Sequence, residues 1–162
     1  MTRAVLDVRL LERGDWHVLR TIRLRALAES PHAFTSPYQR EFRWSEHQWR
    51  RRVETEDWFV AVDDGHVIGM AALVDCSPHD PHHIESIWVA PTHRNRGVFR
   101  ALLDGIIEIA RRAGLTDLWL WVLEDNRCAL RVYERLGFEW TGERQPIRPR
   151  HRCRELRLRR RI

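Results

Sequence analysis

The sequence contains no lysine: all 28 basic residues among its 162 are arginines. This absence excludes a phosphate loop built on a lysine, a Schiff-base lysine and a lysine that acts as general base. Cysteine is scarce as well, and its three residues lie far apart in the chain, namely Cys76, Cys128 and Cys153. They form neither a CxxC pair nor a disulfide ladder. We predict reduced thiols, with Cys128 as a buried structural residue.

Long apolar runs are also missing, since no segment approaches the ~18 residues of a membrane span. The first residues show no secretory signal. We therefore expect a cytoplasmic protein without a membrane partner. The length predicts a single domain over residues 1–162. The net charge, 28 − 23 = +5, is modest for this length, so we do not expect nucleic acid as a partner.

The apolar periodicity predicts an α/β protein with a mixed sheet and the order β-α-α-β-β-β-α-β-α-β-β. The expected strands are residues 5–10, 58–62, 67–73, 84–89, 118–123, 138–141 and 154–158, and the expected helices are residues 15–29, 46–54, 98–113 and 126–136. The passage from residue 84 to 123 implies one parallel crossover, with helices on both faces of the sheet. The continuous apolar run 118–123 predicts a strand buried on both faces.

Capping and turn residues support these boundaries. Asp15 is expected to cap the first helix, and Ser45 and Gln48 fit a capping box at the start of the second. Gly65 in Asp63-Asp64-Gly65 predicts a tight hairpin, because glycine tolerates a positive φ.

One segment combines a buried strand, a turn rich in arginine and glycine, and a helix that follows at once (residues 87–103). The free N–H groups of the first helical turn and the helix dipole favour an anion there. Gly97 would let the backbone approach a phosphate closely, and Arg94, Arg96 and Arg100 add positive charge. The alternative is an ordinary surface turn between a strand and a helix.

This segment resembles the acyl-CoA-binding motif of the GNAT superfamily of N-acetyltransferases. The matching residues are Val89, Pro91, Arg94 and Gly97, whereas Phe99 stands where the motif usually has Gly or Ala. A second stretch resembles the next motif of that superfamily through Asn126, Ala129, Tyr133, Gly137 and Phe138. Residues 126, 129 and 133 fall on one helix face. The resemblance covers roughly residues 4–158, including an N-terminal run like that of many bacterial members.

The resemblance implies a GNAT-like fold in which the acetyl thioester lies in a splay between strands 4 and 5. It implies acetyl-CoA as cosubstrate and no metal. It also implies a cofactor-binding set of Ile87, Trp88, Val89, Arg94, Asn95, Arg96, Gly97, Val98, Phe99, Arg100 and Asn126. The N–H of Val89 would polarise the thioester carbonyl. Asn126 has the alternative role of capping its helix.

Two residues carry the implied proton transfers. Tyr133 would protonate the departing CoA thiolate, and Glu85 would take a proton from the amine, directly or through water. The alternatives are a packed aromatic for Tyr133 and a strand-surface carboxylate for Glu85. Regular alternation would place Glu85 on the same strand face as Ile87 and Val89.

The implied function is an N-acetyltransferase that transfers an acetyl group to a primary amine of a small molecule or peptide, by direct attack in a ternary complex. The alternative, based on Phe99, is a non-catalytic module of the same fold that binds or senses acyl-CoA. A homodimer is compatible with the sequence. His79, His82 and His83 cluster in one loop with Asp80 nearby, but for lack of a clear fourth ligand we favour an ordinary loop over a metal site. Six tryptophans could pack in the core or line an aromatic acceptor pocket, and we favour packing; they are Trp44, Trp49, Trp58, Trp88, Trp119 and Trp121.

Overall fold

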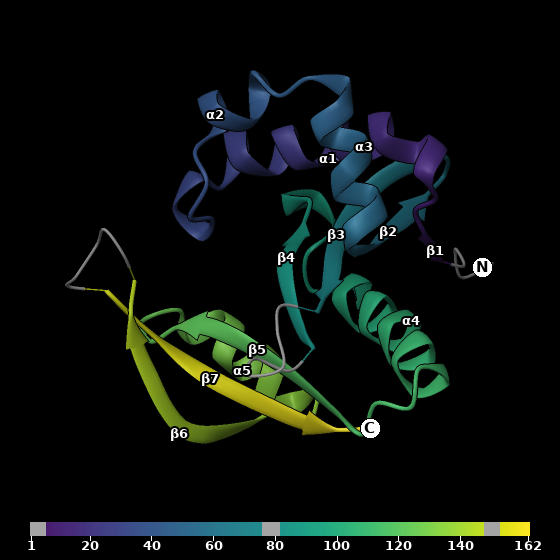
Figure 1. Cartoon of the computed structure of the whole chain (residues 1–162). Helices are drawn as coiled ribbons and strands as arrows, with labels where there is room; N and C mark the ends of the chain where they lie inside the picture. Colours follow the sequence, from purple (N-terminus) through teal and green to yellow (C-terminus); the bar gives the residue numbers. More distant parts are fainter. Residues whose placement is uncertain (1–5, 76–81, 148–152) are drawn as a thin grey trace. The chain divides into compact units, whose positions relative to one another are not determined.

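The computed structural model describes residues 6–75, 82–147 and 153–162 (Figure 1). The strands are β1 (Asp7–Leu10), β2 (Asp57–Asp63), β3 (His66–Val74), β4 (His83–Val89), β5 (Asp117–Leu123), β6 (Glu139–Pro146) and β7 (Arg154–Arg161). The helices are α1 (Trp16–Glu29), α2 (Tyr38–Phe42), α3 (Glu46–Thr55), α4 (Val98–Arg112) and α5 (Arg127–Arg135). The strands form a seven-stranded mixed sheet in the order β1-β2-β3-β4-β5-β7-β6. The predicted fold class is confirmed.

The chain divides into two compact units. The first contains the residues up to Leu73 together with Ser86–Ile106, and the second contains Val74–Glu85 together with Ile107–Ile162. The boundary falls near the end of β3, inside β4 and inside α4. The expectation of a single domain over residues 1–162 stays a prediction.

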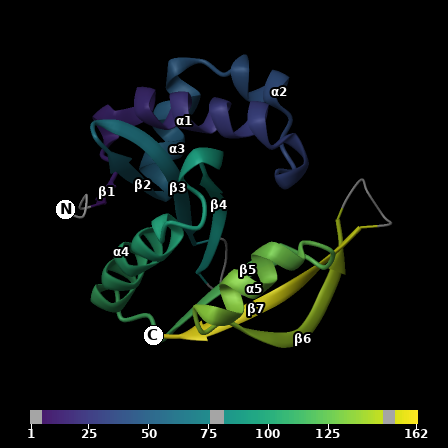
Figure 2. The same ribbon diagram turned by 180° about the vertical axis from the view of Figure 1, so that it is seen from behind.

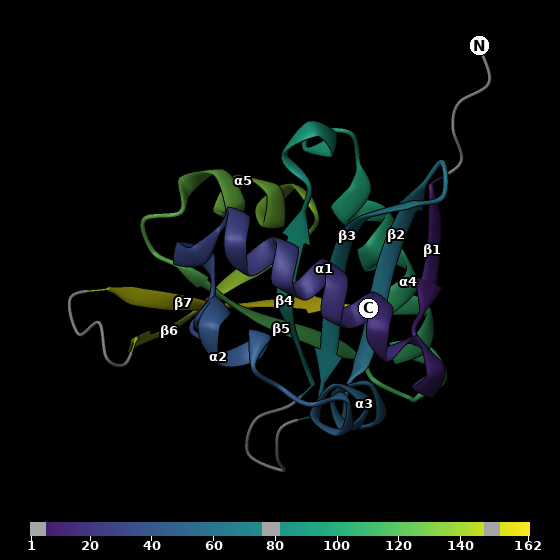
Figure 3. The same cartoon turned by 90° about the horizontal axis from the view of Figure 1, so that it is seen from above.

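In the first unit, β1 and β3 both pair with β2 in antiparallel fashion. Helix α1 lies on one face of these strands and α4 on the other (Figure 3). Every residue of β3 from Ile68 to Val74 is buried, because both faces of that strand are covered. The core includes Leu19, Ile22, Leu27, Trp49, Trp58, Met70, Leu102 and Ile106. The predicted covering of both faces is thereby confirmed.

In the second unit, β7 is antiparallel to both β5 and β6 and lies between them. Helix α5 runs alongside these strands (Figure 2). The start of β4 pairs with β5 in parallel, through His83 with Trp119 and Ile84 with Leu120. This confirms the parallel crossover. Strand β4 continues to Val89 and β5 to Leu123, and the expected splay between them stays a prediction.

The structure tests the helix caps and the turn that the sequence predicts. Ser45 accepts a hydrogen bond from the N–H of Gln48, and the Gln48 side chain accepts one from the N–H of Ser45, which completes the capping box of α3. Asp64 and Gly65 have φ of 47° and 74° and close the β2–β3 turn. Asp15 occupies the N-cap position of α1 as expected, but its side chain does not cap that helix, because its carboxylate accepts from the N–H of Glu12 in the preceding turn.

Three expectations about elements are wrong in detail. Helix α2 has five residues and was not predicted, because so short a segment shows no helical period. Strands β6 and β7 are longer than predicted and reach Pro146 and Arg161. Strand β5 is buried on one face only. On its other face Trp119 and Trp121 are half-buried, and Arg157 of β7 lies over both rings, 4.4 and 5.7 Å from their centroids.

No helix among the described residues is long and apolar enough to cross a membrane.

Candidate functional site

The predicted anion site has the expected backbone. A 3-10 turn over Pro91–His93 follows β4, and a turn over residues 94–97 leads directly into α4. Asn95 and Gly97 both adopt left-handed backbone, with φ of 61° and 80°. The N–H of Ala101 donates to the carbonyl of Gly97 at 3.0 Å, the first hydrogen bond of α4. The N–H groups before it have no acceptor within the helix and can bind an anion.

The arginines of this turn differ in their partners. Arg94 donates through Nε to the carbonyl of Val89 at 3.0 Å and through Nη2 to Glu29 at 2.9 Å, so its guanidinium fastens the turn to β4 and α1. Arg96 and Arg100 are exposed beside the start of α4. Val98 and Phe99 are buried, with 2% and 9% exposure. The ring of Phe99 therefore packs inside the protein, whereas the backbone before it is at the surface.

Glu29, the last residue of α1, joins three elements at this site and was not recognised in the sequence. One oxygen, Oε2, accepts from the indole N–H of Trp88 at 2.9 Å and from Arg94 at 2.9 Å, and it also accepts from the hydroxyl of Ser30. The bond from Ser30, then that from Trp88 and the charge and bond of Arg94, lower the pKa of Glu29 below its ordinary value. Glu29 is thus held ionised where β4 ends.

Gly69 of β3 is a second residue that the sequence did not reveal. A Cβ atom at this position would lie 3.0 Å from Cγ1 of Val98 and 3.2 Å from the carbonyl oxygen of Trp88. The first turn of α4 therefore lies against bare backbone of β3, which fixes the position of the helix N-terminus in the first unit. A glycine inside an apolar strand was the available signal of such a close approach.

The middle of β4 departs from regular geometry. Ser86 has a φ of 55°, a left-handed conformation that is rare for a non-glycine residue within a strand. Regular alternation does not continue through such a residue. The expected common face of Glu85, Ile87 and Val89 rests on that alternation and is therefore not supported. Trp88 is buried, and Ile87 and Val89 are half-buried.

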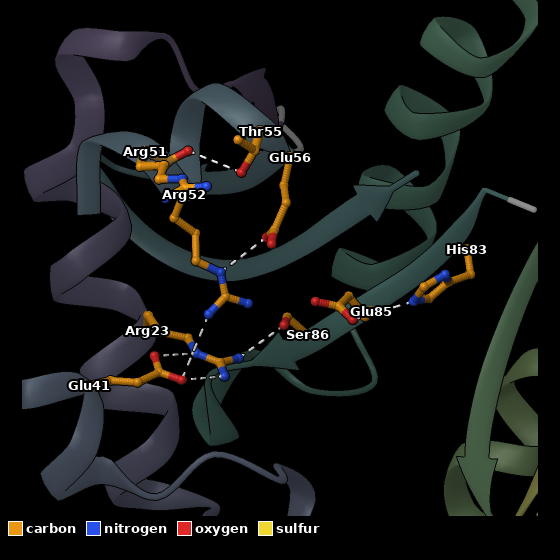
Figure 4. Close-up of polar contacts among 9 residues, drawn as sticks. All are labelled: Arg23, Glu41, Arg51, Arg52, Thr55, Glu56, His83, Glu85 and Ser86. Atoms are coloured by element: carbon orange, nitrogen blue, oxygen red, sulfur yellow. Dashed lines mark hydrogen bonds and ion pairs between the residues drawn. The ribbon is translucent and has the colours of Figure 1, made fainter. Parts of the chain in front are cut away.

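In the second unit the candidate base Glu85 has a neighbour on its own strand. Its Oε2 lies 3.3 Å from Nε2 of His83, which is 8% exposed (Figure 4). The Glu85 side chain itself is 37% exposed. The role of Glu85 as the base stays a prediction.

Of the other two residues predicted in the second unit, Tyr133 lies on α5 and Asn126 immediately precedes it. Burial raises the pKa of the Tyr133 phenol, which keeps the group protonated at neutral pH. Its ring meets Phe138 edge to face, with centroids 6.0 Å apart. Asn126 is the N-cap of α5, because its Oδ1 accepts from the N–H of Ala129 at 3.1 Å. The capping role is confirmed.

Burial tests the predictions made for the remaining tryptophans and cysteines. Trp49 and Trp58 are 1% and 0% exposed, which confirms the packing interpretation for these two. Cys128 is exposed on α5, so the prediction of a buried thiol is wrong. Cys76, His79 and Asp80 lie outside the described residues. Within the described residues no group of three or more His, Cys, Asp or Glu could hold a metal ion.

Comparison with known proteins agrees with this arrangement. The sequence model of the acetyltransferase (GNAT) family matches residues 22–138. The chain is 40% identical over 85 residues to streptothricin acetyltransferase of Streptomyces lavendulae, covering 52% of this chain and 45% of that protein. It is 30% identical over 87 residues to an L-methionine sulfoximine/L-methionine sulfone acetyltransferase of Salmonella typhimurium, covering 52% and 51%. The chain thus spans about half the length of these curated relatives.

A solved structure extends the likeness to nearly the whole chain. An acetyltransferase of the GNAT family from Streptococcus pneumoniae superimposes with a TM-score of 0.81, covering 97% of this chain and 99% of that one at 18% identity. At this identity the likeness concerns the fold. Because the family model matches more than half of the residues, and the fold agrees from end to end, the chain belongs to the acetyltransferase (GNAT) family.

Proposed function

We propose that the protein transfers the acetyl group of acetyl-CoA to a primary amine by direct attack in a ternary complex. The observation that carries this proposal is the strand–turn–helix of residues 87–100, with left-handed Gly97 before α4 and exposed arginines beside it. These features suit the pyrophosphate of CoA, because backbone N–H groups and the helix dipole favour phosphate oxygens. Membership of the family supports the same cosubstrate.

The proposed reaction needs no nucleophile from the enzyme. The amine nitrogen attacks the thioester carbonyl carbon, the carbon–sulfur bond breaks, and the CoA thiolate leaves. The N–H of Val89 would stabilise the oxyanion of the tetrahedral intermediate. Glu85 would accept the proton that the amine loses, and Tyr133 would donate its phenolic proton to the thiolate and regain one from solvent.

The acceptor is proposed only as a primary amine of a small molecule or a peptide. The two relatives described above carry the names of different acceptors, streptothricin in one case and methionine sulfoximine or sulfone in the other. Each matches about half of this chain, so neither name identifies the acceptor here. A panel of amines from several classes is therefore the appropriate search.

Calorimetric titration with acetyl-CoA tests the proposal, with dephospho-CoA as the control for the 3′-phosphate. We expect saturable binding in the micromolar range, and release of free thiol when an acceptor is added from the amine panel. Failure of acetyl-CoA to bind at millimolar concentration would refute the proposed cosubstrate. Binding without turnover on any amine would favour the non-catalytic acyl-CoA module of the same fold.

A further inference from the structure

A buried ion pair lies in the first unit beside the irregular part of β4 (Figure 4). Arg23 of α1 and Glu41 of α2 are 4% and 0% exposed. Arg23 donates through Nε to Oε2 of Glu41 at 2.9 Å and through Nη2 to Oε1 at 2.8 Å. A bidentate pair of this kind fixes the plane and direction of the guanidinium.

The third nitrogen of this guanidinium reaches β4. Arg23 Nη1 donates to the hydroxyl of Ser86 at 2.9 Å. Ser86 is the residue with the left-handed φ of 55° inside the strand. A non-glycine residue keeps such a conformation only where its surroundings over-determine it. The fixed bond from Arg23 to the Ser86 hydroxyl is one such determinant.

One aromatic ring lies against Arg23, and a second arginine approaches Glu41. The guanidinium of Arg23 lies 4.7 Å from the centroid of the Phe34 ring. Arg52 of α3 approaches Glu41 to 3.9 Å and lies over Trp58 at 5.2 Å. Burial alone would raise the pKa of the Glu41 carboxyl, but the hydrogen bonds and charge of Arg23 outweigh it and hold the pKa below its ordinary value. Glu41 therefore stays ionised and keeps Arg23 in place.

We propose that Arg23 is a positioning residue that anchors β4 at Ser86 and so sets the backbone of Ile87–Val89. The inference rests on the proposed function, in which the N–H of Val89 polarises the thioester carbonyl and stabilises the oxyanion. A change in the φ of Ser86 rotates the peptide groups that follow it. Misplacement by about 1 Å can cost about 100-fold in rate. A purely structural pair would instead stabilise the contact of α1 with α2 and leave these N–H groups unaffected.

The test is a double-mutant cycle of Arg23→Gln and Ser86→Ala, with Arg20→Gln as the matched control. Arg20 is on the same helix, and its guanidinium lies 5.8 Å from the Phe42 ring. Two readouts are compared: kcat and KM for acetyl-CoA, and hydrogen–deuterium exchange of the amides of residues 87–89. We expect Ser86→Ala to lower kcat about tenfold or more, with CoA affinity within about twofold, because in the proposed function residues 94–100 bind the phosphates.

Because both substitutions remove the same contact, the double variant should lose no more kcat than Arg23→Gln alone. Hydrogen–deuterium exchange of the amides of residues 87–89 should be faster in Arg23→Gln and in Ser86→Ala than in the wild type. It should be unchanged in the control Arg20→Gln. If Arg23→Gln does not fold, Ser86→Ala alone still tests the inference, since it leaves the Arg23–Glu41 pair intact. Unchanged kcat and exchange in Ser86→Ala would overturn the inference. Wild-type protein that binds no acetyl-CoA would overturn the proposed function instead, whatever the exchange shows.

Discussion

Gly97 allows the sharpest test of the anion site, because Gly65 provides a matched control in the same unit. The two residues have φ of 80° and 74°, and a Cβ atom at either position would meet nothing within 4 Å. Substitution by alanine therefore brings backbone strain without a clash. The left-handed conformation costs about 1–2 kcal/mol, and the stiffer unfolded chain returns about 0.4–1 kcal/mol. The net loss is about 1 kcal/mol for each variant.

We expect the two variants to differ only in their binding of acetyl-CoA. Both should lower Tm by about 2–4 °C, the shift expected from about 1 kcal/mol in a chain of this size. Gly97→Ala should also weaken acetyl-CoA binding about 10-fold or more, the equivalent of one charge-assisted hydrogen bond. The reason is that, in the proposed complex with acetyl-CoA, the added methyl group would lie where a phosphate approaches the turn. Gly65→Ala should bind acetyl-CoA as the wild type does.

Thermal unfolding and calorimetric titration on the same preparations measure both quantities. Equal losses of affinity in the two variants would mean that affinity follows stability, and the proposed role of Gly97 would be refuted. A fall in Tm confined to Gly97→Ala would contradict the strain argument itself.

Three further predictions concern titratable side chains. Because the folded-state pKa of Glu29 lies below 4.5, its contribution to stability is present above about pH 4.5 and is lost as pH falls through the folded-state value. Urea titrations of Glu29→Gln should therefore show a loss of about 0.2–1 kcal/mol at pH 7 that disappears in acid; a loss independent of pH would contradict this. Tyr133→Phe should lower kcat about 100-fold or more while calorimetry gives an unchanged Kd for CoA, and wild-type turnover would remove Tyr133 from the mechanism. Glu85→Gln should shift the acidic limb of the pH–rate profile, and an unchanged profile would leave the base unassigned.

Local patterns were sufficient to predict most of the fold. The strand–turn–helix around Gly97, the capping box at Ser45 and the turn at Asp64-Gly65 each involve residues within a few positions of one another. Backbone preference and capping act over that range, so sequence periodicity reports them well. The error at β5 has a different origin. Six apolar residues in a row predict burial on both faces, but an arginine from β7 covers the indole rings of Trp119 and Trp121.

Only part of the candidate site could be predicted from the sequence, because sequence patterns report local contacts and not contacts between distant residues. Residues 94–100 form one short turn, and a single stretch of sequence contains the whole motif. The groups that hold this region are distant in the chain: Glu29 bonds Trp88 and Arg94 across 59 and 65 residues, and Arg23 bonds Ser86 across 63. In the sequence they are ordinary members of a helix. Only tertiary folding brings a carboxylate and a guanidinium to β4.

These two contacts share a consequence for the proposed chemistry. Helix α1 touches β4 at Ser86 through Arg23 and at Trp88 through Glu29, on either side of Ile87. A strand anchored at two points by charged side chains has little freedom in the peptide groups between them. Stabilisation of an oxyanion requires such preorganised N–H donors, since donors that must reorient lose much of their benefit. In the proposed mechanism, helix α1 would therefore hold in place the strand segment whose N–H polarises the thioester.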